Sequence, residues 1–163
     1  MKLLKRITCA LLSIILVNLS FAVPVFAAEE SSVVELEATV TANYGDGVVS
    51  YADSRSTTFS DTSIYISYSS EGMHIVICTD LTMTASVVGV KDIQIQKKGL
   101  LGTWTTVATS DGGEVTNASG CVTTLDYAGA EYGETYRVTC IHYGNVDGYR
   151  ELYHETVGAK CVY

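Results

Sequence analysis

The sequence has little proline, little charge and no helical pattern in its main body. One proline stands among 163 residues, and charged residues make up only 17%. Acidic residues outnumber basic ones by 18 to 10, which argues against a nucleic-acid binder. Eleven tyrosines and many β-branched residues argue against a disordered acidic chain. The composition also excludes a collagen-like chain, and the missing helical periodicity excludes a coiled coil.

The first 27 residues differ in composition from the rest. Three basic residues precede an apolar run centred on residues 11–17, and small residues surround Ala27. This order predicts a cleaved, helical signal peptide over residues 1–27. Pro24 interrupts the apolar helix, which favours cleavage over the alternative of an uncleaved anchor. Cleavage removes three basic residues and no acidic one, so the net charge moves from −8 to −11. We expect a secreted protein, extracellular or associated with the cell envelope, without stable membrane insertion.

Four cysteines remain after this cut. They are Cys78, Cys121, Cys140 and Cys161. An even number in an exported chain predicts two disulfides, with three pairings open. The spacings lack the close cysteine pair of a zinc ribbon. The alternative is that they remain buried thiols in a reducing habitat.

Alternation of apolar and polar residues dominates the chain after the signal. Residues 92–97 alternate cleanly: Ile93 and Ile95 are expected to face a core, and Gln94 and Gln96 to face water. Residues 99–102 are expected to form a hairpin loop. Short strands with turns every 8–12 residues predict an all-β protein, and specifically an antiparallel β-sandwich.

The expected domain organisation has three parts. Residues 1–27 are the signal, residues 28–61 form a leading strand and a polar loop or arm, and residues 62–163 form the sandwich. The leading strand is expected over residues 33–44. Its water-facing side would carry Glu35, Glu37, Thr39 and Thr41.

Several segments of the last hundred residues are similar to a known family. They include Gly72-Met73-His74-Ile75, Gly102-Thr103-Trp104 and Tyr136-Arg137-Val138. With these segments the chain resembles a group of small secreted proteins from Clostridia-type Firmicutes, a domain of unknown function. The resemblance covers residues 62–163 and is loosely immunoglobulin-like or fibronectin-III-like. It implies a fold and a location, but no activity.

Motifs for catalysis or metal binding are weak. The pattern predicts Tyr136, Val138, Cys140 and His142 on one face of a strand. Cys140 and His142 could join His74 or His154 as metal ligands, but a structural role for them is favoured because the histidines lack close pairing. The chain also lacks a Gly-x-Ser-x-Gly elbow. We therefore predict no catalytic residue, no metal and no cofactor, and a protein that is not an enzyme.

The aromatic residues give the strongest indication of function. Seven of the 11 tyrosines lie in residues 127–163. Exposed tyrosines make binding surfaces, although the alternative of ordinary cross-strand packing stays open. We predict a non-catalytic module that binds an extracellular protein or glycan, or alternatively a carbohydrate-binding module. A metal-dependent or hydrolytic enzyme is the third hypothesis. The candidate binding residues are Trp104, Tyr143, Tyr149 and Tyr153.

Overall fold

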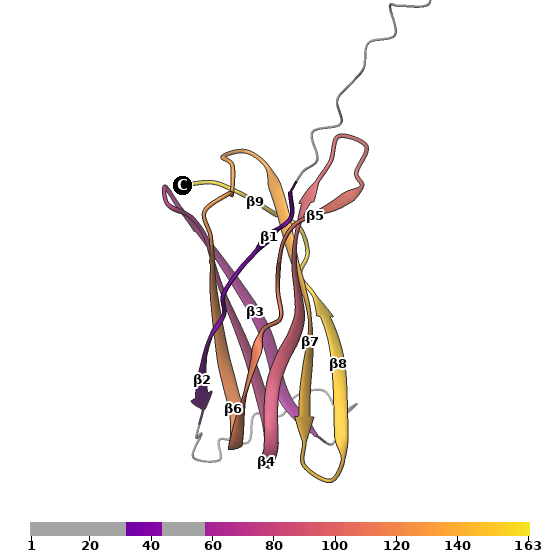
Figure 1. Ribbon diagram of the computed structural model, residues 1–163. Helices are drawn as coiled ribbons and strands as arrows, with labels where there is room; N and C mark the ends of the chain where they lie inside the picture. Colours follow the sequence, from indigo (N-terminus) through magenta and orange to yellow (C-terminus); the bar gives the residue numbers. More distant parts are fainter. Residues whose placement is uncertain (1–31, 44–57) are drawn as a thin grey trace, which may run out of the picture. The chain divides into compact units, whose positions relative to one another are not determined.

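The computed structural model describes residues 32–43 and 58–163. The described residues form nine strands and no helix, which confirms the predicted all-β class (Figure 1). The strands are β1 (Val34–Glu35), β2 (Thr39–Asn43), β3 (Phe59–Ser69), β4 (Gly72–Lys98), β5 (Trp104–Ser110), β6 (Gly113–Tyr127), β7 (Thr135–Asn145), β8 (Tyr149–Glu155) and β9 (Ala159–Lys160). The predicted signal peptide and most of the predicted polar loop lie outside the described residues.

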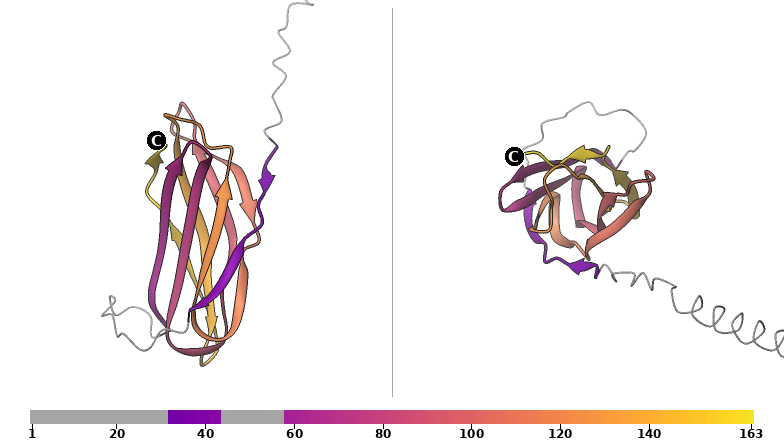
Figure 2. Two further views of the ribbon diagram at one scale, coloured as in Figure 1. Left: turned by 90° about the vertical axis from the view of Figure 1, so that its left-hand side faces the viewer. Right: turned by 90° about the horizontal axis from the view of Figure 1, so that it is seen from above.

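The long strand β4 organises the sheet. Along one edge it pairs with β6 and then with β5, so that Met73 lies opposite Tyr127 and Lys98 lies opposite Trp104. Along the other edge it pairs first with β3 and then with β7. A register shift between Asp80 and Ala85 separates its two halves. Seen from above, the strands curl around a common core (Figure 2).

All nine strands join one hydrogen-bonded sheet, and β1 pairs with β5 in parallel whereas the other pairings are antiparallel. The structure therefore does not confirm the predicted sandwich of two sheets or its immunoglobulin-like arrangement. A curled sheet and a sandwich both place alternate side chains inside. The sequence alternation alone therefore does not distinguish the two folds.

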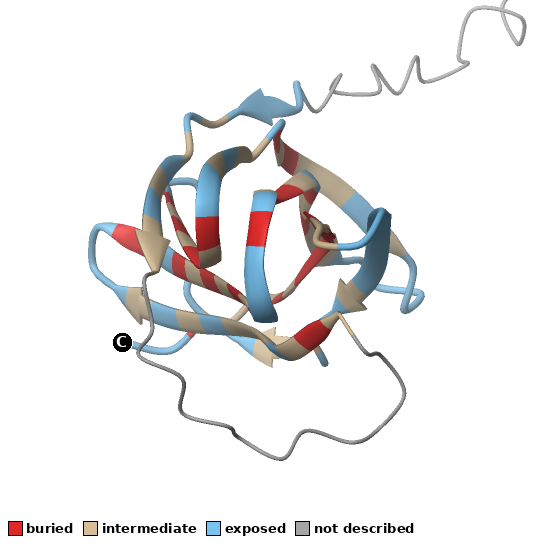
Figure 3. Cartoon of the chain, turned by 90° about the horizontal axis from the view of Figure 1, so that it is seen from below, coloured by how far each residue is buried: buried red, intermediate tan, exposed pale blue. Residues whose placement is uncertain are grey.

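The core lies inside the curl, where buried residues of both halves of β4 meet (Figure 3). Ile75 and Ile77 come from the first half, and Ile93 and Ile95 from the second; each is at most 1% exposed. The predicted inward orientation of Ile93 and Ile95 is thus confirmed. Tyr136 from β7 completes this cluster. The strands themselves enclose this core, so within the described residues the sheet buries its inner face without a covering helix.

The leading strand predicted over residues 33–44 is present as two short strands, β1 and β2. Its predicted water-facing residues Glu35, Glu37, Thr39 and Thr41 are all exposed. β2 pairs with β6 and so covers one of its edges. β3 begins at Phe59, three residues before the expected start of the domain. In the described part of the chain, no helix has the length and apolar character needed to cross a membrane.

The cysteines differ from the prediction. The structure has Cys78, Cys121, Cys140 and Cys161 as free thiols, so the two expected disulfides are not formed. Cys121 is buried opposite Thr79, whereas its neighbour Cys78 points to the other face of β4 and is half-buried. Cys161 donates its N–H to the carbonyl of Glu134, six residues before Cys140 in the chain. Six residues along a strand span roughly 20 Å, so Cys161 lies too far from Cys140 for a disulfide between them.

Candidate functional site

The four predicted aromatic residues lie on the outer face of the sheet, but they do not form one continuous platform. Trp104 lies opposite Lys98 near one end of β4. Tyr149 lies opposite Asn145, and the neighbouring Gly144 lies opposite Val88. Lys98 and Val88 are ten residues apart along β4, which corresponds to roughly 30 Å. Tyr149 and Tyr153 are the more exposed rings, at 50% and 60%.

Trp104 is covered by cationic side chains. The Arg137 guanidinium lies 4.6 Å from the ring centroid, and Lys98 Nζ lies 5.8 Å from it. These cation–π contacts hold the indole against the outer face of the sheet. Arg137 therefore occupies ring area that a sugar would need for stacking.

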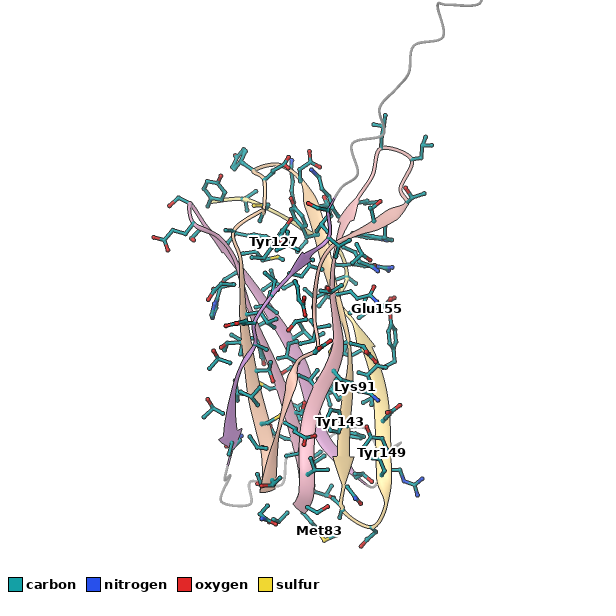
Figure 4. The ribbon with its side chains drawn as sticks, viewed as in Figure 1. Met83, Lys91, Tyr127, Tyr143, Tyr149 and Glu155 are labelled. Carbon is teal, nitrogen blue, oxygen red and sulfur yellow. The ribbon has the colours of Figure 1, made fainter. Side chains whose placement is uncertain are left out.

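Tyr143 is a packing residue rather than a contact surface. It is only 7% exposed, and its ring covers Gly89, where an added Cβ would meet the tyrosine oxygen at 2.6 Å. Its hydroxyl donates a hydrogen bond to Glu114 at 2.8 Å. Burial, with Glu114 nearby, raises the pKa of Tyr143 well above its usual range. Tyr149 packs 5.7 Å away, and Lys91 lies beside both rings (Figure 4).

A hollow opens on the outer face beside Tyr153. We call it the Asp92 hollow; its volume is about 460 Å³. Asp92 lies in a β-bulge, where the pairing of β4 with β7 shifts between Lys91 and Gln94. Its φ of 51° is in the left-handed region, which aspartate tolerates better than most residues. The lining residues are Asp92, Ile93, Gln94, Thr109, Ser110, Asp111, Thr139, Ile141 and Tyr153.

Hydrogen bonds fix the side chains around this hollow. Gln94 Oε1 accepts hydrogen bonds from Gln96 Nε2 at 3.0 Å and from Thr106 Oγ1 at 3.2 Å. The Tyr153 hydroxyl donates to Glu155 at 3.0 Å. Two of the lining side chains, Gln94 and Tyr153, are therefore oriented by hydrogen bonds within the protein itself.

The inner face carries a different cluster. Tyr136, Val138, Cys140 and His142, which the sequence predicted on one face of a strand, are all buried. His142 Nδ1 lies 2.7 Å from Thr79 Oγ1, and His142 Nε2 lies 3.5 Å from Cys140 Sγ and 3.2 Å from His154 Nδ1. Cys140 and His154 are direct cross-strand partners. The curl thus encloses a small polar network within an apolar core.

The environment of this network keeps its members neutral. Burial lowers the pKa of His142 to about 4, with a smaller contribution from His154. Burial raises the pKa of the Cys140 thiol to about 12. A nucleophilic cysteine needs a depressed pKa and access to substrate, and Cys140 has neither. No set of three or more His, Cys, Asp and Glu side chains in residues 32–43 and 58–163 is arranged to hold a metal ion.

Tyr153 could be predicted from the sequence as a binding residue, whereas the rest of the Asp92 hollow could not. Alternation shows which side chains share a face, but a bulge breaks the alternation by one residue. The only feature of the sequence that indicates this hollow is an aspartate within an apolar strand pattern. Aspartate is also common in turns, so this feature does not identify a site.

The chain was compared with family models, with curated proteins and with solved structures, and none of the three comparisons gave a match. The resemblance to secreted clostridial proteins therefore stays a prediction.

Proposed function

We propose that this protein is a non-catalytic, extracellular binding module whose ligand is a carbohydrate held in the Asp92 hollow. The observation that carries the proposal is the combination of an exposed ring, Tyr153, with polar groups of fixed geometry around one hollow. Carbohydrates present apolar C–H faces to aromatic rings and hydroxyl groups to amides and carboxylates. The hollow offers both kinds of partner.

Charge restricts the class of carbohydrate. Asp92 and Asp111 both line the hollow, and the whole chain carries a formal charge of −8. Carboxylates accept hydrogen bonds from hydroxyl and ammonium groups but repel anionic polymers. We therefore propose a neutral or amino-bearing glycan rather than an acidic one.

Tyr149 extends this surface. It lies four residues from Tyr153 on the same face of β8, a separation of about 13 Å along a strand. A glycan chain that follows β8 would contact Tyr153 first and Tyr149 further along. A longer glycan should therefore bind more tightly than a short one.

The test is retention on immobilised neutral, amino-bearing and acidic polysaccharides, with a glycan array to resolve the sugar. Tyr153→Ala should weaken binding by at least about tenfold, which corresponds to about 1.4 kcal/mol. Tyr153→Phe should retain most of the binding, because the ring face remains. Tyr65→Ala is the matched control, since Tyr65 is equally exposed but lies on β3.

Three outcomes would contradict the proposal. They are retention on no glycan, equal binding by Tyr153→Ala and wild type, and release of reducing ends. The last would show that the protein is a glycoside-hydrolysing enzyme, and Asp92 and Asp111 would then be the first carboxylates to replace.

A protein partner is the second candidate, favoured by the edge of β8. Within the described part of the chain β8 pairs only with β7, so its other edge offers backbone groups to an added strand.

A further inference from the structure

The hairpin between β4 and β5 ends in two exposed leucines. Leu100 is fully exposed and Leu101 is 91% exposed. Single exposed apolar residues are common on protein surfaces, but two adjacent leucines with almost no protein contact are not. We call residues 99–103 the leucine tip. It stands at the upper end of the strands, the same end as the loop that joins β6 to β7 (Figure 1).

The turn holds the leucines outward. The Gly99 N–H donates to the Thr103 carbonyl at 2.7 Å, and the Gly102 N–H donates to the Gly99 carbonyl at 2.9 Å. Gly102 adopts a φ of +79°, which a glycine accepts without strain. The tip is therefore a fixed, convex projection.

More apolar surface accompanies the tip at this end. Tyr132 precedes β7 and Tyr163 ends the chain, and their rings form an edge-to-face pair with centroids 5.4 Å apart. Both rings are more than half exposed. Tyrosine and tryptophan favour the boundary between water and lipid, because one part of each side chain is apolar and the other polar.

The charges near the tip suit the same boundary. Lys98 and Trp104 face each other at the base of the hairpin, with Lys98 Nζ 5.8 Å from the ring. Lys97 is paired with Glu131 at 3.1 Å and Glu134 at 3.8 Å. The base of the hairpin therefore lacks the excess of negative charge found in the chain as a whole. Lysine can keep its ammonium group in water while its stem lies against lipid.

From these observations we infer that the leucine tip inserts into the surface of a lipid bilayer. Leu100 and Leu101 enter the apolar boundary, while Lys98, Trp104 and the Tyr132–Tyr163 pair lie at the level of the headgroups. This attachment is peripheral and reversible, because two leucines bury too little surface to anchor a protein permanently. It would hold the Asp92 hollow close to a membrane, although it does not depend on that hollow.

The test measures co-sedimentation of the purified full chain with vesicles. One set is phosphatidylcholine alone, and the other is about 70% phosphatidylcholine and 30% phosphatidylglycerol. Leu100→Ser/Leu101→Ser should weaken binding to both by roughly 100-fold, about tenfold for each leucine. Tyr65→Ser, which removes an exposed ring from β3, should bind as wild type does. All variants carry the same apolar N-terminal segment, so differences between them report on the hairpin.

Trp104 provides a second measurement, because it is the only tryptophan in the chain. Vesicles should shift its emission to shorter wavelength, and brominated lipid should quench it. Neither change should occur in the double serine variant. Binding should persist in about 1 M salt, where electrostatic attraction is screened beyond about 3 Å.

Two results would overturn the inference. One is absence of wild-type binding to both vesicle types, which would point to a protein partner for the tip. The other is equal vesicle binding by wild type and the double serine variant. Thermal unfolding of each variant should match wild type, because the replaced side chains are exposed. That measurement excludes misfolding as the cause of any loss.

Discussion

The two faces of the hairpin formed by β7 and β8 differ in the kind of residue and in access. The inner face holds Cys140, His142 and His154, whose side chains are often reactive in proteins. The Cys140 thiol and the His142 imidazole are buried and neutral, and His154 is half-buried. The outer face holds Tyr149 and Tyr153, which have no strong reactivity but are open to solvent. Access and pKa, rather than residue type, therefore favour the outer face as the proposed binding surface.

Thiol labelling should show the largest difference between the faces. Cys78 points outward and is half-buried, whereas Cys121, Cys140 and Cys161 are fully buried. Without denaturant, an alkylating reagent should modify Cys78 at least about 1,000-fold faster than the other three. These become accessible only when the domain opens, which costs several kcal/mol. Peptide mass spectrometry at successive times measures the four rates.

The same experiment tests the disulfides. In denaturant without a reducing agent, all four thiols should react, because the structure contains them as free cysteines. Failure of a pair to react until reductant is added would show a disulfide and restore the prediction made from the sequence.

The free energies of unfolding of two tyrosine variants measure the difference between a buried inner-face residue and an exposed outer-face residue. Tyr136 is fully buried, and Tyr136→Ala should cost about 3–5 kcal/mol. Tyr153 is 60% exposed, and Tyr153→Ala should cost less than about 0.5 kcal/mol. Urea unfolding followed by circular dichroism gives both values.

Tyr136→Phe separates packing from hydrogen bonding. The Glu131 N–H donates to the Tyr136 hydroxyl at 3.0 Å, so this substitution should cost only about 1 kcal/mol. Equal costs for the two alanine substitutions would show that the ring of Tyr153 belongs to the core and would remove it from the binding surface.

The division of residues between the inner and outer faces was largely predictable from the sequence. Side chains alternate between the two faces along any strand, so the order of residues gives the face. This alternation correctly placed Tyr136, Val138, Cys140 and His142 on one face of β7. It did not predict that β4 runs through 27 residues as one strand. The curl depends on pairings between residues far apart in the chain, such as Met73 with Tyr127, and short periodic windows contain no information on them.

The candidate site was predictable only in part, for a related reason. Tyr153 was identified by its residue type and its place in a tyrosine-rich hairpin. Asp92 and Asp111 belong to the hollow only because the β4 bulge and the turn between β5 and β6 bring them beside Tyr153. Tyr143 is buried because the facing residue is Gly89, and only the pairing register shows this.

A further effect, smaller than the one expected for Tyr136→Ala, is the pH dependence that His142 gives to folding. Its pKa is about 4 in the folded protein, whereas its ordinary value is 6.5. Between these values the unfolded chain binds a proton that the folded chain does not. Stability present above pH 6.5 is therefore lost as the pH falls toward 4. Between pH 7 and pH 5 the loss should be about 2 kcal/mol.

Burial also lowers the pKa of His154, which acts in the same direction, although Asp61 opposes it. Carboxylates elsewhere titrate in the same range, so His142→Gln is needed to isolate the contribution of His142. Urea unfolding at pH 7 and pH 5 should show a smaller loss in the variant than in wild type, by about 2 kcal/mol. Equal losses would mean that water or a proton reaches His142 in the folded state. In that case the inner face would be open to solvent, and the contrast with the outer face would no longer explain where the ligand binds.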